Sequence, residues 1–213
     1  MSASPAGPDE ALAGPRAAAS LAARLRQETA ALHTEVELVA DLPGSIAGRA
    51  DYRRLLRSFE QAYLELTAGP RTGLPTEHWV TLGVEPAGAG QLGLIRADLA
   101  VLGSSPTLPY GQPVPTSADE QLGHLYVLEG SALGRRVLAP LLMARLGPIP
   151  VSFFLDETRH PRGWLALQSA LRALDGDVDR HPGVLRGARH AFQVFLRHLH
   201  APTRADRPDL ALP

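Results

Sequence analysis

Apolar residues recur with a helical period along most of this chain, and breakers rich in proline and glycine interrupt that period. No run of alternating β-branched residues is long enough to predict a sheet. The one strand-like string, VSFF at 151–154, is interpreted as a packed turn. Ser117 and Asp119 are candidate N-caps of a long helix. The pattern predicts an all-α fold with helices at about 17–40, 49–68, 88–103, 117–146, 162–175 and 182–200.

Both ends of the chain are rich in proline, alanine and polar residues. We therefore expect a disordered N-terminal tail at 1–16, one domain at 17–201 and a flexible C-terminal tail at 202–213. The opening residues lack a basic region followed by an apolar one, and no stretch of about 20 apolar residues occurs. The sequence thus predicts a cytoplasmic protein with no membrane span.

Charge and cysteine content exclude several function classes. The formal net charge is −1, which provides no general attraction to nucleic acid or to an anionic membrane. The chain has no cysteine, so disulfides, zinc–thiolate sites and thiol chemistry are excluded. Neither a nucleic-acid partner nor a membrane partner is expected.

The first predicted helix carries a histidine, His33, in the string RQETAALHTEVE. A helical wheel places His33 about 90° from the apolar stripe of this helix. Glu37 lies one turn on, and Arg26 lies two turns back, about 10.5 Å away, roughly the reach from a porphyrin's iron to its carboxylates. A flat ligand could lie here, or His33 could be a half-buried residue that pairs with a surface glutamate. The small residues that flank the histidine on the wheel are Ala22, Thr29, Ala30 and Ala40.

The fourth predicted helix carries three glycines, Gly123, Gly130 and Gly134, within about 40° of one line on the wheel. Each mid-helix glycine costs roughly 1 kcal/mol relative to alanine, so the missing side chains must serve something. Bare backbone allows close approach of another helix or of a planar ligand. The sequence leaves both readings open.

These stretches together resemble the haem oxygenases, and most closely the bacterial ones found beside bacteriophytochromes. The resemblance covers roughly 20–200. It implies a single-domain helical bundle of the haem-oxygenase type, with haem between the first helix and a glycine-containing distal helix. The strings that carry it are LRQETAALHTEVE at 25–37, LYVLEGSALGRRVL at 125–138 and AFQVFLRHL at 191–199.

The resemblance implies a role for each matching residue. His33 would be the axial iron ligand, and Glu37 would be its hydrogen-bond partner. Arg26 and Tyr126 would hold the haem propionates, with Arg172 as a further candidate. Phe192 would line the pocket. The catalytic set would be His33 together with the distal residues Gly130, Ser131 and Gly134.

The implied reaction is oxidative cleavage of haem to biliverdin, Fe(II) and CO, with O2 and electrons from a ferredoxin or reductase. A bacteriophytochrome would be the acceptor of the bilin. Two departures from the family pattern stand out. Arg135 occupies a position where many members have a second glycine, and could point outward or narrow the freedom of the helix. Ser131 lies where some members have a distal aspartate.

Three alternatives stay open on the sequence. The chain could bind haem without turnover, as a carrier or sensor. It could be a di-iron bundle, for which Glu157 and His160 form the one Glu-x-x-His pair. It could also be an interaction module without a ligand.

The other histidines are interpreted structurally. His124 is expected at a helix interface, and His78 with Trp79 in a short connecting helix. A solvated basic face is expected to hold His160, His181, His190, His198 and His200.

Overall fold

The computed structural model describes residues 19–67, 89–107, 116–156 and 160–200. These residues form helices and connecting turns, with no strand among them, so the all-α prediction is confirmed. The two predicted tails and the predicted connecting helix around His78 and Trp79 lie outside the described residues. The helices are α1 (Leu21–Ala40), α2 (Arg49–Thr67), α4 (Ala89–Val101), α5 (Ala118–Leu146), α6 (Ser152–Leu155), α7 (His160–Ala173) and α8 (His181–His200).

Capping residues explain where two of the long helices begin. The first helix begins at Leu21 and not near residue 17, because the Ser20 side chain accepts a hydrogen bond from the Ala23 amide. At α5 the predicted cap Ser117 forms a full capping box with Glu120. Acidic side chains in the first turn of α5 also complement the positive end of the helix dipole.

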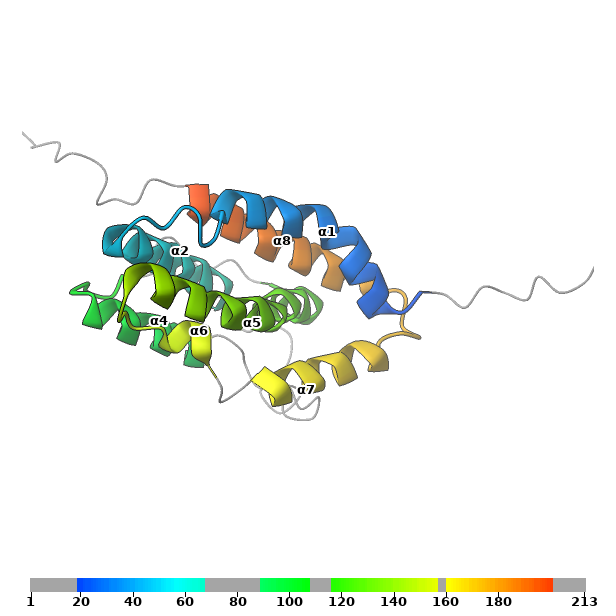
Figure 1. Cartoon of the computed structure of the whole chain (residues 1–213). Coiled ribbons are helices and arrows are strands. Elements are labelled where there is room, and N and C mark those ends of the chain that lie inside the picture. The colour runs from blue at the N-terminus through cyan, green and yellow to red at the C-terminus, as the bar shows by residue number, and fades with distance from the viewer. Residues whose placement is uncertain (1–18, 68–88, 108–115, 157–159, 201–213) are drawn as a thin grey trace, which may run out of the picture.

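Helix α8 is the centre of the bundle, and α5, α1 and α2 all pack against it (Figure 1). Its apolar residues recur every three or four positions, and Val184, Ala188 and Ala191 are fully buried. The crossing with α5 is close because both backbones are bare there. A Cβ on Gly123 would overlap the backbone of α8, and a Cβ on Gly187 would overlap the backbone at Glu120.

The string at 151–154 is not the packed turn that we expected. Residues 152–155 form the short helix α6, with Phe153 and Phe154 buried in the core. The buried carboxylate of Asp98 on α4 accepts hydrogen bonds from the Ser152 and Phe153 amides at 3.1 and 3.0 Å. This side chain therefore caps α6 from another helix, which the local sequence could not show.

Among the helices that the structure describes, none combines the length and the apolar character needed to span a bilayer.

Candidate functional site

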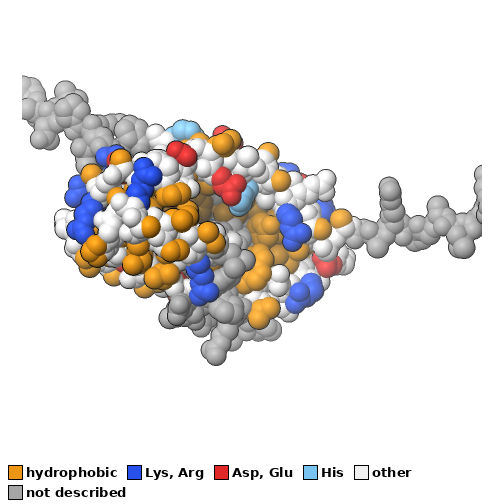
Figure 2. All heavy atoms as spheres, viewed as in Figure 1, with side chains coloured by type: hydrophobic (Ala, Val, Ile, Leu, Met, Phe, Trp, Pro, Cys, Tyr) orange, Lys and Arg blue, Asp and Glu red, His pale blue; other side chains and the backbone are white. Residues whose placement is uncertain are grey.

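Helices α1 and α5 both pack on α8, and α7 contacts each of them. On the face shown in Figure 2, the surface between these helices is hollowed and hydrophobic side chains line it. The candidate site residues come from the sides of α1 and α5 that remain uncovered by α8 and from α8 itself.

His33 projects from α1 into solvent, with 60% of its side chain exposed. Its Nδ1 lies 3.5 Å from Glu37 Oε2, one turn further along the helix. The buried ring of Phe192 on α8 meets the imidazole edge to face, with 5.9 Å between ring centroids and 72° between ring planes. Glu37 and Phe192 thus hold the ring on two sides, and Nε2 is the nitrogen left for a metal.

The small-residue surface beside His33 differs from the expected one at one position. Thr29 is buried, and its hydroxyl donates a 2.7 Å hydrogen bond to the Leu25 carbonyl. Ala30 is exposed, and Ala22 is half-buried. The uncovered surface of α1 is therefore narrower than the helical wheel indicated.

Tyr126 reaches from α5 to the same part of α1. Burial raises the pKa of the Tyr126 phenol above its ordinary value, while the charge of Arg26 and a hydrogen bond with the Thr29 side chain lower it. Arg26 itself is exposed. The charge of Arg26 on α1 thus acts on the phenol of Tyr126 on α5, and both side chains can donate hydrogen bonds to an anion.

The three glycines of α5 serve different purposes. Gly123 lies in the crossing with α8, as helix packing requires. Gly130 and Gly134 are exposed, and the space beside Gly134 is open to at least 4 Å. The same face continues with Val137 and Leu141, which are 66% and 46% exposed. This strip, formed by 130, 134, 137 and 141, is an uncovered apolar surface next to bare backbone.

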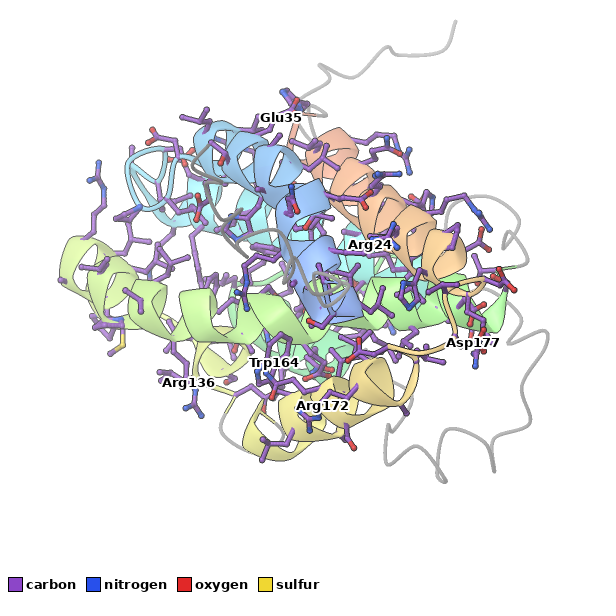
Figure 3. The ribbon with its side chains drawn as sticks, turned by 90° about the vertical axis from the view of Figure 1, so that its right-hand side faces the viewer. Arg24, Glu35, Arg136, Trp164, Arg172 and Asp177 are labelled. Atoms are coloured by element: carbon purple, nitrogen blue, oxygen red, sulfur yellow. The ribbon has the colours of Figure 1, made fainter. Side chains whose placement is uncertain are left out.

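Trp164 on α7 is a candidate site residue that sequence reasoning missed. Its indole lies beside Gly130, 3.6 Å from where a Cβ would stand, and its ring centroid is 6.2 Å from that of Tyr126. Figure 3 shows Trp164 on the side of α7 that faces α5. Only the packing of α7 on α5 places this ring at the glycine strip, so spacing within one helix held no signal for it.

Ser131 and Arg135 both turn away from the strip. The Ser131 hydroxyl donates a 2.8 Å hydrogen bond to the Leu128 carbonyl. Arg135 points inward and is only 5% exposed, which decides between the orientations that the sequence left open. Its guanidinium donates a 2.6 Å hydrogen bond to the Tyr63 hydroxyl and lies 4.3 Å from the centre of the Phe153 ring.

The predicted solvated basic face is wrong for His181 and His190, and His198 is also half-buried, with its Nε2 2.9 Å from Glu65 Oε2. His181 is buried, with Nδ1 3.1 Å from Arg24 and Nε2 2.8 Å from the Leu174 carbonyl. His190 is half-buried, and its Nδ1 lies 3.0 Å from Nε2 of His124. His124 is buried where α5 meets α8, as expected, and burial lowers its pKa to about 4.

Two further candidates are less informative. Arg172 is exposed near the end of α7 (Figure 3), and Glu157 of the di-iron alternative lies outside the described residues. Within the described parts of the chain, no group of three or more histidine and carboxylate side chains is arranged to hold a metal ion.

The arrangement suits a flat, largely apolar ligand that carries a metal and anionic groups. One imidazole is available for the metal, the α5 strip offers apolar surface, and Arg26 with Tyr126 can hold anionic groups.

Comparison with known proteins bears on the family and the fold of this chain. No family model matches the chain. A curated protein of Xanthomonas campestris pv. campestris (strain 8004), named heme oxygenase, is 32% identical over 115 residues, which are 52% of this chain and 67% of that protein. The crystal structure of the NO- and CO-bound heme oxygenase from Neisseria meningitidis has a TM-score of 0.64 and 22% identity, covering 92% of this chain and 100% of that one, and shows the shared fold. On the extent of the Xanthomonas match, this chain belongs to the haem oxygenase family.

Proposed function

We propose that this chain cleaves haem oxidatively to biliverdin, Fe(II) and CO, using O2 and electrons from an external donor. Family membership makes it a haem-degrading oxidoreductase. The product, the donor and the roles of individual residues are our proposals. The observation that carries them is an exposed imidazole on α1 and an open glycine strip on α5, on two helices that both pack on α8.

The residues present fit haem on three independent features. His33 has a free ring nitrogen and a carboxylate at the other nitrogen, as metal-binding histidines commonly have. Val137 and Leu141 of the α5 strip expose large apolar side chains on one helix face, where they could contact an apolar ring. The third feature is the arginine and tyrosine pair, whose donors suit the propionates.

Each residue would then have a defined task. Nε2 of His33 would hold the iron, while the Glu37 carboxylate, 3.5 Å from Nδ1, would accept the Nδ1 proton in a hydrogen bond and so fix the tautomer and the ring orientation. Arg26 and Tyr126 would set the in-plane rotation of the ring by gripping its propionates. Haem, when bound, supplies the oxygen and redox chemistry.

The distal residues would act through shape. Gly130 and Gly134 would let the α5 backbone lie close to the ring, where a Cβ would hold it away. Ser131 would contribute through its position in this turn, since its hydroxyl donates to a backbone carbonyl and its side chain also hydrogen-bonds with the buried Tyr63 phenol. Phe192 would form part of the wall behind the imidazole.

We further propose an acidic ferredoxin or a reductase as the electron donor and a bacteriophytochrome as the acceptor of the bilin. The similarity of three sequence strings to haem oxygenases found beside bacteriophytochromes supports the second proposal. The cytoplasmic address stays a prediction from the sequence.

The deciding experiment is a haem titration followed by one turnover with O2 and reductant, with chromatography of the pigment. We expect a Soret band typical of imidazole-ligated haem and then a bilin. Haem that binds but is never converted would instead support a carrier or sensor, and the absence of a Soret shift would refute a haem site altogether.

A pair of histidine variants tests the ligand. His33→Ala should lose the imidazole-type spectrum and most turnover. His200→Ala is the matched control, because this exposed histidine lies at the end of α8 and, among the described residues, its hydrogen-bond partner is a backbone carbonyl of its own helix. A wild-type spectrum in His33→Ala would contradict the assignment.

A further inference from the structure

Arg135 is a buried cation on α5, next in sequence to the glycine strip of the proposed haem site. It lies between three elements: its own helix α5, α2 through the Tyr63 hydroxyl at 2.6 Å, and α6 through the face of Phe153 at 4.3 Å. Tyr63 is fully buried, and its ring meets that of Phe153 at 88° with 5.7 Å between centroids. The guanidinium therefore occupies a packed aromatic niche and not a solvated surface.

This arrangement is poorly compensated for a buried charge. Among the described residues, Nε of Arg135 is buried without a hydrogen-bond partner, and the acceptor that its guanidinium reaches at 2.6 Å is a neutral phenol. Burial raises the pKa of the Tyr63 phenol, so this hydroxyl stays protonated. Glu129 contributes a nearby negative charge. Apolar residues of similar volume often replace buried charges without loss of stability. Stability is therefore a weak reason for an arginine at this position.

Arg135 can instead fix the rotation of α5 about its own axis. Gly134 and Arg135 are adjacent, so they project about 100° apart around α5. Gly134 faces open space while Arg135 is held at a fixed point in the core. The position of this side chain therefore helps to set which way the glycine strip faces, together with the packing of α5 on α8.

The segment of α5 around Arg135 is weakly held by its own backbone and so depends on contacts with other helices. Pro140 lies inside α5 and cannot donate the hydrogen bond to the Arg136 carbonyl that a helix would otherwise form. The two exposed glycines further reduce the intrinsic preference of this segment for the helical state.

We propose that Arg135 is a positioning residue for haem cleavage: through Tyr63 and Phe153 it fixes the rotation of α5 about its axis, and so fixes where the glycine strip stands over the ring. The proposal rests on the proposed haem site. It gives a role to Arg135, which occupies a position where the family resemblance leads us to expect a glycine.

The test compares Arg135→Met with Arg136→Met. Methionine fills similar volume but is flexible and makes no directional hydrogen bond. Arg136 is the matched control, because it is the next residue on the same helix and lies outside the aromatic niche, where it is half-buried and donates a long 3.4 Å hydrogen bond to the Asp156 carbonyl (Figure 3). Tyr63→Phe removes the acceptor while the arginine stays.

Hydrogen exchange of the ligand-free protein is the first readout. In Arg135→Met, amides at 130–137 should exchange about 10- to 100-fold faster, the range for losing one hydrogen bond to a charged group. The melting temperature should stay near that of the wild type. Arg136→Met should change neither quantity, and Tyr63→Phe should reproduce the exchange effect.

The second readout is the ratio of biliverdin isomers after one turnover. Arg135→Met should broaden the ratio and Arg136→Met should not. Wild-type exchange in Arg135→Met overturns the proposal, and so does a large fall in melting temperature with an unchanged isomer ratio. If the wild type itself binds no haem, the proposed function fails, and the exchange data still judge whether Arg135 anchors α5.

Discussion

The glycines of α5 allow a stability prediction in which two chemically identical changes have opposite signs. Gly123→Ala and Gly134→Ala both add one methyl group in the same helix, on the same side of the helical wheel. Each gains about 1 kcal/mol of helix propensity in the free energy of folding. Their surroundings decide the rest.

At Gly123 the added Cβ would lie 2.5 Å from the backbone nitrogen of Ala188 and closer still to the Val184 carbonyl oxygen. These atoms belong to the backbone of α8, so the whole crossing must shift. Overpacking of this kind costs about 1–3 kcal/mol, and more where backbone must move. Because the overlap is with backbone, the cost should lie at the top of this range, which leaves a net loss of roughly 2 kcal/mol after the propensity gain of about 1 kcal/mol.

At Gly134 nothing lies within 4 Å of the added Cβ, so the gain of about 1 kcal/mol should remain. For a domain of this size, 1 kcal/mol shifts the melting temperature by about 2–4 °C. Thermal and urea unfolding of the ligand-free protein should therefore place Gly134→Ala above the wild type and Gly123→Ala several degrees below it. Equal shifts for both variants would refute the reasoning, because the packing of α5 on α8 would then not distinguish the two sites.

The same Gly134 variant should weaken haem binding, because its methyl group would stand in the proposed slot. Gly134→Leu should weaken it further and impair turnover. A Gly134 variant that unfolds at a higher temperature without ligand but binds haem more weakly would show that the glycine serves the haem site and not the stability of the fold. Haem affinity equal to that of the wild type in both variants would contradict the distal role of the strip.

Three further predictions address the remaining charged groups. Glu37→Gln should keep haem bound but weaken its retention about 10- to 100-fold, measured as the rate of haem transfer to apomyoglobin; unchanged retention would contradict the role of Glu37 at His33. His124 has a folded pKa of about 4, below its unfolded value of 6.5, so the stability it contributes is complete above pH 6.5 and is lost as the pH falls through 4. Between pH 7 and pH 4, the unfolding free energy of His124→Gln should fall by up to about 3 kcal/mol less than that of the wild type, as measured by urea unfolding. An equally steep fall in both proteins would contradict the role of His124. Glu60 is fully buried; burial alone would raise the pKa of its carboxyl, but hydrogen bonds from Thr107, Arg57 and Arg96 hold that pKa below the usual value. Glu60→Gln should therefore destabilise the fold near neutral pH by roughly 3 kcal/mol, the low end for a broken buried pair, because both arginines are partly exposed. Calorimetry would measure this loss, and an unchanged unfolding free energy would contradict it.

The sequence by itself determined the helices and most of their ends. The apolar period of a helix is a local property, and so are the capping box at Ser117 and the one-turn spacing of His33 and Glu37. These features required no knowledge of neighbouring elements. The family resemblance also depended only on strings within single helices.

Tertiary structure alone decided what each helix face meets. A helical wheel reports the angle at which a side chain leaves the helix axis, but not whether solvent or another element lies there. Gly123 and Gly134 share an angle, yet one meets the backbone of α8 and the other meets open space. Arg135 is buried because two other helices cover it. Helix α2 contributes Tyr63, 72 residues earlier in the chain, and α6, the helix after α5, contributes Phe153.

The same reason explains the other differences. His181 and His190 lie in a segment rich in arginine, which predicts a solvated face, but α8 turns them toward α1 and α5. Trp164 reaches the glycine strip only because α7 folds back onto α5. Contacts between distant segments depend on how the helices cross, and the spacing of residues within one helix does not contain that information.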